Sequence, residues 1–274
     1  MKPFRKYIQT STSQGAKDPI ILDTILVKKN LMKSKISVKK LDSQQMNLRS
    51  NKINNSNYET IKKFNDSKIN IKYFTIHMRN NKERYTLIKN LERDLNHKIN
   101  IFDAVDGNKI DLETLNLYDS NIKLNINFKF KGELGCYLSH LQLLKKISNN
   151  TNQDYSIILE DDCSVLRDYV HLNILHILDQ INVDFDIIFL GNMNNNNGEH
   201  YRNNIYFVNN DTKLWGTYAY LVNNKNIYKI INLLYDIDNA IDIKFKKLID
   251  NKELIGLVIF PQLMTQANID STIR

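Results

Sequence analysis

Three consecutive carboxylates, Glu160, Asp161 and Asp162, directly follow the apolar run 155–159. The run has the length and composition of a strand buried on both faces, and a polar, turn-like segment precedes it. In an open α/β sheet, the carboxyl ends of the strands form the ligand crevice. Neighbouring like charges are unfavourable without a cation, and hard divalent cations prefer carboxylate oxygens. The stretch therefore predicts a metal and nucleotide site. The alternative is a solvated acidic turn that caps the following helix.

The composition argues against a phosphate loop. A Walker B strand also consists of apolar residues followed by acids, but it works with a loop of the form G-x-x-x-x-G-K-[ST], which the chain lacks. Only 8 glycines and 3 prolines occur among the 274 residues, so other glycine-rich phosphate loops are not expected either.

The positive charge of the chain is concentrated at its N-terminal end. The net charge is +8, but residues 1–70 hold 15 Lys and Arg against 5 Asp and Glu, whereas 71–274 hold 23 against 25. One-signed charge without apolar periodicity favours disorder, so we predict a basic, disordered extension over 1–70 and one domain over 71–274. Because that domain is nearly neutral, nucleic acid is not expected as its partner. The extension alone would bind a polyanion weakly and with strong salt dependence.

Several features predict a cytoplasmic location by default. No apolar run reaches the roughly 18 residues of a membrane span. The first residues lack the apolar segment of a signal peptide. Two cysteines, Cys136 and Cys163, cannot form a disulfide framework, and we expect both to be reduced and dispensable for chemistry. The abundance of Asn, Ile and Lys is typical of an AT-biased genome, such as that of a virus.

The elements that must position the acids alternate between strands and helices. Apolar runs predict strands over 71–78, 99–105, 155–159, 186–191, 205–208, 217–222 and 255–260. Apolar residues at helical spacing predict helices after the first strand, after Gly132, and over 168–181, 224–235 and 240–250. The segment 192–198 is polar and is predicted to be a mobile loop. This order predicts an α/β fold, a mixed sheet with helices on both faces.

Seven stretches, in the right order, resemble glycosyltransferase family 25, the group of lipopolysaccharide-type and collagen hydroxylysine glycosyltransferases. They are the first strand and turn through Arg84, 102–107, 132–140, 158–162, 185–191, 215–221, and 241–242 together with 261–266 and 270–271. The block 132–140, GELGCYLSH, is the most specific. The resemblance covers about 71 to 274 and implies a GT-A fold, a Rossmann-like single domain.

The resemblance also implies a reaction. It implies transfer of galactose or glucose, with inversion, from a UDP-sugar in the presence of Mn²⁺ or another divalent cation. The acceptor would be a hydroxyl of a glycan or of hydroxylysine in a collagen-like protein. The carboxylates agree with this reaction, because a divalent metal stabilises the charge that develops on a diphosphate leaving group.

The resemblance assigns roles to single residues. Glu160 and Asp162 match a D-x-D-like motif and are the metal candidates, since residues two apart in an extended segment share a face. Asp242 matches a late acid and is the candidate for the general base that inversion requires. The donor-binding candidates are Arg79, Asn80, Arg84, Asp106, Glu133, His140 and Asp161, with Gln262 and Gln266 as possible additions near the donor pocket.

Each donor-binding candidate has a structural alternative. Arg79 to Arg84 would equally suit a solvated helix start, and Asp106 would suit a tight turn before Gly107. A histidine within a helix, such as His140, is more often packed than functional. The main functional alternative is a catalytically inactive protein of the same fold that binds a glycan or a protein, and the intact acids at 160 and 162 argue against it. The sequence predicts no oligomeric state.

Overall fold

The computed structural model describes residues 69–111, 115, 119–125, 128, 131–150, 152–191 and 198–267. All of them belong to one compact unit, Phe64–Arg274. The predicted basic extension lies outside these residues except for Ile69 and Asn70, and the predicted mobile loop lies outside them except for Gly198. Both therefore stay predictions, as does the boundary between extension and domain.

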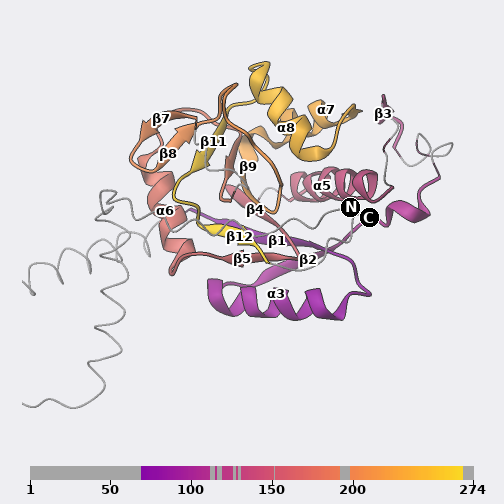
Figure 1. The fold of residues 1–274 in the computed structure, drawn as a ribbon, viewed down its shortest axis with the longest axis horizontal. Helices are drawn as coiled ribbons and strands as arrows, with labels where there is room; N and C mark the ends of the chain where they lie inside the picture. Colours follow the sequence, from indigo (N-terminus) through magenta and orange to yellow (C-terminus); the bar gives the residue numbers. More distant parts are fainter. Residues whose placement is uncertain are drawn as a thin grey trace, which may run out of the picture. The chain divides into compact units, whose positions relative to one another are not determined.

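A mixed sheet of eight strands forms the centre of the described part (Figure 1). In chain order its strands are β1 (Ile71–His77), β2 (Ile99–Asp103), β4 (Tyr155–Glu160), β6 (Ile187–Phe189), β7 (Glu199–Arg202), β8 (Ile205–Phe207), β9 (Ala219–Asn223) and β11 (Gly256–Ile259). Their order across the sheet is β2-β1-β4-β9-β6-β11-β8-β7. β2, β1 and β4 are parallel to one another, as are β6 and β11, and β9 runs antiparallel between β4 and β6.

Helices cover both faces of the sheet, because alternate residues of a strand point to opposite faces. The helices are α3 (Lys82–Leu95), α5 (Lys131–Ser148), α6 (Val170–Gln180), α7 (Ile227–Leu234) and α8 (Ile241–Asp250). In β4, Ile157 and Leu159 belong to the core formed with α3 and α6, whereas Ile158 belongs to the core formed with α5, α7 and α8. Figure 1 shows α3 and α5 on opposite sides of β1, β2 and β4. The predicted α/β fold, a mixed sheet with helices on both faces, is confirmed.

The predicted strands and helices all occur, and apart from the start of α7 (Ile227) their ends are shifted by no more than two residues. The helix predicted over 224–235 is divided into the 3₁₀ turn η2 (Asn224–Asn226) and α7. The prediction missed β7 and two small sheets, in which β3 (Lys123–Leu124) pairs with β10 (Asp236–Ile237) and β5 (Cys163–Val165) pairs with β12 (Met264–Gln266). Among the helices of the described part, none has both the length and the apolar character to cross a membrane.

Candidate active site

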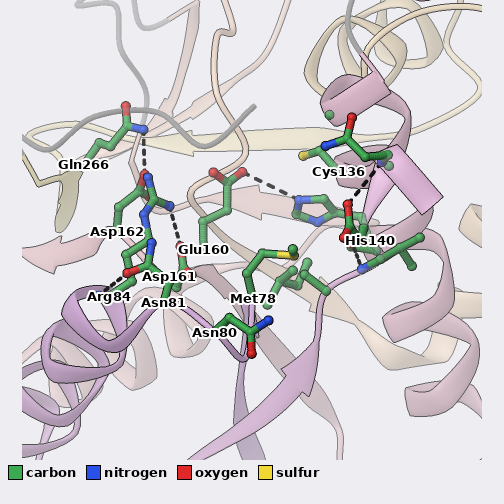
Figure 2. Close-up of a pocket in the computed structure, with 18 of the residues that line it drawn as sticks. Met78, Asn80, Asn81, Arg84, Cys136, His140, Glu160, Asp161, Asp162 and Gln266 are labelled. Carbon is green, nitrogen blue, oxygen red and sulfur yellow. Dashed lines mark hydrogen bonds and ion pairs between the residues drawn. The ribbon is translucent and has the colours of Figure 1, made fainter. Parts of the chain in front are cut away.

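The three acids lie where strands β1 and β4 end side by side. β1 and β4 are parallel, with Ile76 opposite Glu160, and β2 continues the same edge with Asp103 opposite His77. A cavity of about 470 Å³ opens at this edge (Figure 2). It is lined by Ile76, Met78, Asn80, Asn81, Lys82, Arg84, Ala104, Val105, Asp106, Gly107, Asn108, Gly132, Cys136, Ser139, His140, Glu160, Asp161, Asp162 and Gln266.

Asp161 is a buried anchor between β1 and α3. One carboxylate oxygen, Oδ2, accepts a hydrogen bond from His77 Nδ1 at 2.8 Å, and the other, Oδ1, accepts one from Arg84 Nη1. All three side chains are at most 7% exposed. Arg84 is placed by its helix, because Asn81 caps the start of α3 by accepting the Arg84 backbone N–H. Since both of its oxygens are engaged by protein groups, Asp161 fixes β4 against α3.

Asp162 differs from its neighbour because part of its carboxylate is unsatisfied. Its Oδ2 accepts a hydrogen bond from Gln266 Nε2 at 3.0 Å and lies 3.1 Å from Arg84 Nη2. Its Oδ1 is buried and has no hydrogen-bond partner among the described residues. Burial, together with the charge of Glu160, raises the pKa of Asp162. A cation bound at Oδ1 would supply the missing partner and offset both effects.

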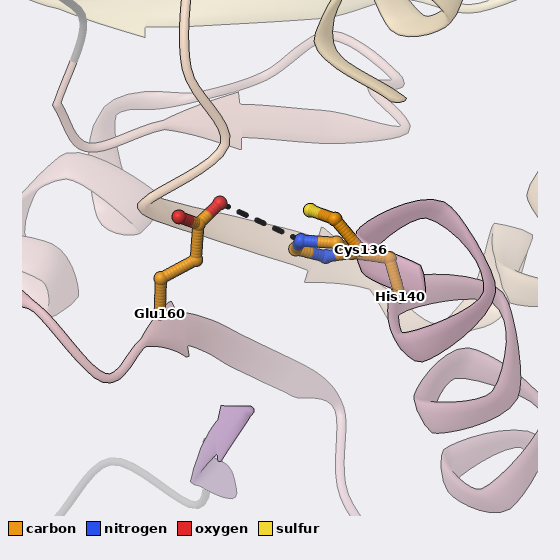
Figure 3. Close-up of side chains that lie close together, drawn as sticks. All are labelled: Cys136, His140 and Glu160. Atoms are coloured by element: carbon orange, nitrogen blue, oxygen red, sulfur yellow. Dashed lines mark ion pairs between the residues drawn. The ribbon is translucent and has the colours of Figure 1, made fainter. Parts of the chain in front are cut away.

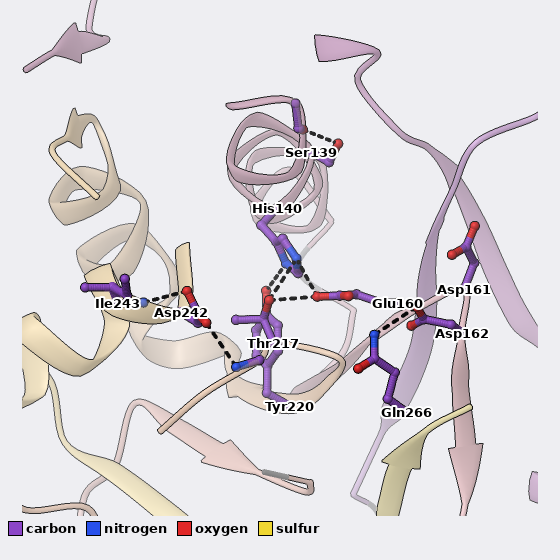
Figure 4. Close-up of polar contacts among 12 residues, drawn as sticks. Ser139, His140, Glu160, Asp161, Asp162, Thr217, Tyr220, Asp242, Ile243 and Gln266 are labelled. Atoms are coloured by element: carbon purple, nitrogen blue, oxygen red, sulfur yellow. Dashed lines mark hydrogen bonds and ion pairs between the residues drawn. The ribbon is translucent and has the colours of Figure 1, made fainter. Parts of the chain in front are cut away.

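Glu160 is held on the other side of the cavity by His140 of α5 (Figure 3) and by Thr217 of the segment before β9 (Figure 4). Its Oε1 accepts a hydrogen bond from Thr217 Oγ1 at 2.7 Å and lies 3.6 Å from His140 Nε2. His140 is fully buried, and its Nδ1 lies 2.8 Å from the Tyr220 hydroxyl. Burial alone would raise the pKa of Glu160, but the contacts with His140 and Thr217 and the charge of Arg84 outweigh it and lower the pKa. Glu160 is therefore kept as a carboxylate.

The wall of the cavity opposite the acids requires two glycines. A Cβ at Gly107 would lie 1.9 Å from the backbone oxygen of Lys131, and a Cβ at Gly135 would lie 2.7 Å from the backbone N of Gly107. Ser139 strengthens this contact: its Oγ accepts the Val105 N–H at 2.8 Å and donates to the Gly135 carbonyl. The loop after β2 thus packs directly on α5, and the motifs 102–107 and 132–140 form one wall.

The structure brings most of the predicted site residues to the cavity. Those that line it are Asn80, Arg84, Asp106, His140, Glu160, Asp161, Asp162 and Gln266. Asp106 also caps the 3₁₀ turn η1 (Gly107–Lys109), where it accepts the Asn108 N–H.

Four predicted residues are absent from the lining. Arg79 forms a surface ion pair with Asp103, and its side chain is 79% exposed. Glu133 lies in the first turn of α5, and Gln262 follows β11. Asp242 lies in the first turn of α8, where its Oδ2 accepts the Gly216 N–H at 3.1 Å and its Oδ1 accepts its neighbour's N–H (Figure 4). Gly216 directly precedes Thr217, so Asp242 is connected to Glu160 through that segment.

Several residues that shape the site were not expected from the sequence. His77 ends β1 and forms a hydrogen bond with Asp161. Thr217 forms a hydrogen bond with Glu160, and Tyr220 forms one with His140 (Figure 4). Cys136 lines the cavity one turn before His140. The position of His77 at the carboxyl end of a strand was a usable signal, because that end of the sheet was already predicted to bind the ligand.

A divalent cation fits the donor atoms present. Glu160 and Asp162 offer carboxylate oxygens at one cavity, and Asp162 Oδ1 lacks a partner in the described part of the chain. Oxygen ligands of this kind suit Mg²⁺, Ca²⁺ or Mn²⁺. The donor set is therefore compatible with a divalent cation and does not identify which one.

Comparison with known proteins gives a family match. The sequence model of the family described as "Glycosyltransferase family 25 (LPS biosynthesis protein)" matches residues 70–245, which is more than half of the chain. Two curated relatives from Xenopus laevis, procollagen galactosyltransferases 1-B and 1-A, are 30% and 29% identical over 131 residues. Each alignment covers 43% of this chain, and the chain spans only 20% of the length of these relatives.

Likenesses among solved structures are weaker. A glycosyltransferase involved in the glycosylation of the major capsid of PBCV-1 has a TM-score of 0.41 at 10% identity, covering 73% of this chain and 94% of that chain. The glycosyltransferase GlyE of Streptococcus pneumoniae TIGR4 has a TM-score of 0.31 at 11% identity, covering 66% of this chain and 43% of that chain. The sequence match to the family carries the assignment.

Proposed function

Because this chain belongs to glycosyltransferase family 25, we propose that it transfers a hexose, galactose or glucose, from a UDP-sugar to an acceptor hydroxyl, with inversion and with the help of a divalent metal ion. The observation that carries the proposal is the pair Glu160 and Asp162 on one cavity, with Asp162 Oδ1 buried and unpartnered within the described residues. A carboxylate pair of this kind suits a nucleoside diphosphate held through a divalent cation, which needs only one or two protein carboxylates.

In this proposal Glu160 and Asp162 hold the metal, Mn²⁺ being our first candidate. The metal, when bound, acts as a Lewis acid on the diphosphate. Thr217 and His140 orient Glu160, and Gln266 and Arg84 orient Asp162. Orientation of this kind is what outer contacts of a metal site provide. Asp161 supports the site by fixing β4 to α3 rather than by touching the metal.

The remaining lining residues suit the donor. Asn80 lies in the turn before α3 and Arg84 in the first turn of that helix, while Asp106 and Gly107 lie in the loop after β2. In a Rossmann-like sheet both loops belong to the nucleotide-binding edge. We assign uridine and ribose to this side of the cavity. Arg79 and Glu133 stand outside the lining, so we give them at most an indirect role in binding the donor.

Asp242 is the proposed general base. It would remove the proton from the acceptor hydroxyl as the oxygen attacks the anomeric carbon and the bond to UDP breaks on the opposite face. Its carboxylate oxygens accept backbone N–H groups of Gly216 and Ile243, which holds the side chain in one orientation. Gly216 adjoins Thr217, the partner of Glu160, so one short segment connects the proposed base to the metal pair.

The acceptor is proposed by class only. The matched relatives are named for procollagen and the family is described by lipopolysaccharide biosynthesis. Both acceptors present a hydroxyl, on hydroxylysine in a collagen-like chain or on a sugar of a glycan. A cytoplasmic location is compatible with the second and stays a prediction.

The test is a panel of UDP-sugars assayed for UDP release in Mn²⁺ or in EDTA, with a hydroxylysine peptide, a glycan or no acceptor. We expect one UDP-hexose to be used, with metal and acceptor both required, and a product of inverted configuration by NMR. Tight binding of UDP and Mn²⁺ without transfer to either acceptor class would support the inactive binding protein instead. Lack of binding to any UDP-sugar would refute the proposal.

A further inference from the structure

Three side chains of different chemistry meet at one side of the cavity. Cys136 and His140 lie one turn apart on α5, and Glu160 reaches them from the end of β4 (Figure 3). One ligand atom of each, the cysteine sulfur, an imidazole nitrogen and a carboxylate oxygen, lies within 4.8 Å of the other two. All three residues line the same cavity, which gives an ion a path to them.

The spacing of the His140 nitrogen and the Glu160 oxygen is close to that of a tetrahedral site. Zn–N and Zn–O distances of about 2.0–2.2 Å place two such ligand atoms about 3.4 Å apart, and His140 Nε2 lies 3.6 Å from Glu160 Oε1. The other nitrogen of His140, Nδ1, lies 2.8 Å from the Tyr220 hydroxyl. When Nδ1–H donates to that hydroxyl, Nε2 keeps its lone pair and faces Glu160, as in protein zinc sites.

The ligand types distinguish this group from the proposed catalytic pair. Carboxylate oxygens alone suit Mn²⁺ and Mg²⁺, whereas a thiolate with an imidazole suits Zn²⁺ and similar borderline-soft ions. We propose that Cys136, His140 and Glu160 form a second, zinc-type site, with the fourth position open to the cavity. On binding, the Cys136 thiol would lose its proton to solvent and coordinate as the thiolate.

The two sites share Glu160, so we expect them to compete for this carboxylate. A zinc ion held by Cys136 and His140 would take this carboxylate from the pair with Asp162. Zinc would then act as an inhibitor that competes with the catalytic metal. The inhibition rests on the proposed function, whereas zinc binding by the three residues does not.

Binding is tested first, with the whole chain and zinc alone. Calorimetry should give one zinc per chain, and Co²⁺ used in its place should give a thiolate-to-metal charge-transfer absorption. Cys136→Ser should abolish that absorption and lower the affinity for zinc. Loss of an outer partner costs a metal site roughly 10- to 100-fold in affinity, and loss of a ligand should cost at least as much. The matched control is Cys163→Ser, since the second cysteine is also free and belongs to no such group in the described residues. It should bind zinc as the unmodified chain does.

A reciprocal pair of variants separates the two sites. Asp162→Asn should lower the affinity for Mn²⁺ and leave the affinity for zinc unchanged. Cys136→Ser should lower the affinity for zinc and leave the affinity for Mn²⁺ unchanged. If the chain transfers sugar, zinc should inhibit the transfer in competition with Mn²⁺. With each protein's rate measured against its own rate without zinc, Cys136→Ser should need at least about tenfold more zinc than the unmodified chain for half inhibition. Equal zinc affinity in Cys136→Ser and the unmodified chain, or no 1:1 zinc binding at all, overturns the zinc site. Those binding results stand even if no transferase activity is found.

Discussion

Asp161 and Asp162 are adjacent in the chain, yet the described residues satisfy both carboxylate oxygens of Asp161 and only one of Asp162. His77 and Arg84 pair with the two oxygens of Asp161, whereas Asp162, which lines the cavity, has one buried oxygen without a partner among the described residues. The same substitution at these two positions should therefore give different losses, of stability at one and of metal binding at the other.

Asp161→Asn should destabilise the fold. It removes the negative charge between His77 and Arg84, and loss of one partner from a buried ion pair commonly costs about 3–5 kcal/mol. Urea unfolding followed by circular dichroism measures the change. The control is Asp103→Asn, which removes a surface pair with Arg79 and should cost at most about 1 kcal/mol. Equal stability of the two variants would contradict the anchoring role of Asp161.

Asp162→Asn should leave the fold stable and weaken the binding of Mn²⁺ and UDP together. It keeps the shape of the side chain but removes one of two charges from the proposed metal pair. We expect at least about a tenfold loss of affinity, or about 1.4 kcal/mol, by calorimetry. Asp184→Asn is the control, because this carboxylate is exposed and its ion pair with Lys225 is long, at 3.9 Å from the Nζ atom. Normal binding and transfer by Asp162→Asn would remove the basis of the proposed function.

Asp242→Asn should separate binding from turnover. The amide can still accept the Gly216 N–H, so binding of UDP and Mn²⁺ should change little. Transfer should fall by about 10²–10⁴-fold, the usual contribution of a general base. Asp250→Asn, at the other end of α8 and paired with Lys246, is the matched control and should transfer normally. If Asp242→Asn loses UDP–Mn²⁺ binding instead, Asp242 is a ligand and another group is the base.

Gly135→Ala should destabilise the wall between the loop after β2 and α5. Alanine is favoured over glycine in a helix by about 1 kcal/mol, but its Cβ would meet backbone atoms of Val105 and Gly107 at 2.7 Å. Backbone atoms cannot move aside like a flexible side chain, so we expect a net loss of about 1–2 kcal/mol and weaker UDP binding. Thermal unfolding measures the change. The control is Lys131→Ala, at an exposed position at the start of α5, which should alter the free energy of unfolding by no more than about 0.5 kcal/mol. A stabilised Gly135→Ala variant would show that the contact is not tight.

Stability should fall in mild acid because of His171. Burial and the neighbouring His97 ring, stacked at 3.8 Å, lower the pKa of His171 to about 4. The unfolded chain, with an ordinary pKa near 6.5, binds this proton first, so the free energy of unfolding decreases as the pH falls from about 6.5 to about 4. Solvent screening at the partly exposed ring limits the loss to roughly 1–2 kcal/mol.

His171→Gln tests this, because glutamine cannot titrate but can still accept from the Tyr73 hydroxyl, which lies 2.8 Å from His171 Nδ1. Urea unfolding from pH 7 to pH 5 should show a smaller loss of stability in the variant. His200→Gln, at an exposed histidine of β7, should follow the unmodified chain. A parallel pH dependence in His171→Gln would contradict the assignment.

The sequence was informative wherever a local pattern decides the outcome. The run 155–159 followed by acids predicted a buried strand whose carboxyl end lies at the ligand edge of the sheet. A continuous apolar run indicates a strand buried on both faces, and ligands bind at the carboxyl ends of such strands. The period-two argument also favoured Glu160 and Asp162 over Asp161 as the metal pair, and the structure turns Asp161 toward α3.

What the sequence could not predict depends on pairings between distant segments. Gln266 reaches Asp162 because β12 pairs with β5, about a hundred residues apart, and both strands are only three residues long. Such short strands carry little periodicity of their own. The joint position of Cys136, His140 and Glu160 likewise arises from the packing of α5 against β4, which no local pattern specifies.

The orientation of β9 has a consequence for how this chain can diversify. β9 runs against β4 and β6, so its first residue, Ala219, lies beside Leu159 at the carboxyl end of β4. The segment that enters β9 therefore reaches the acids, and it arrives from the turn over 209–212 at the surface. Residues could be inserted in that turn without shifting the register of β9 or moving the acids of β4. Descendants of this gene could thereby vary that surface turn while inheriting the same cavity and its acids unchanged.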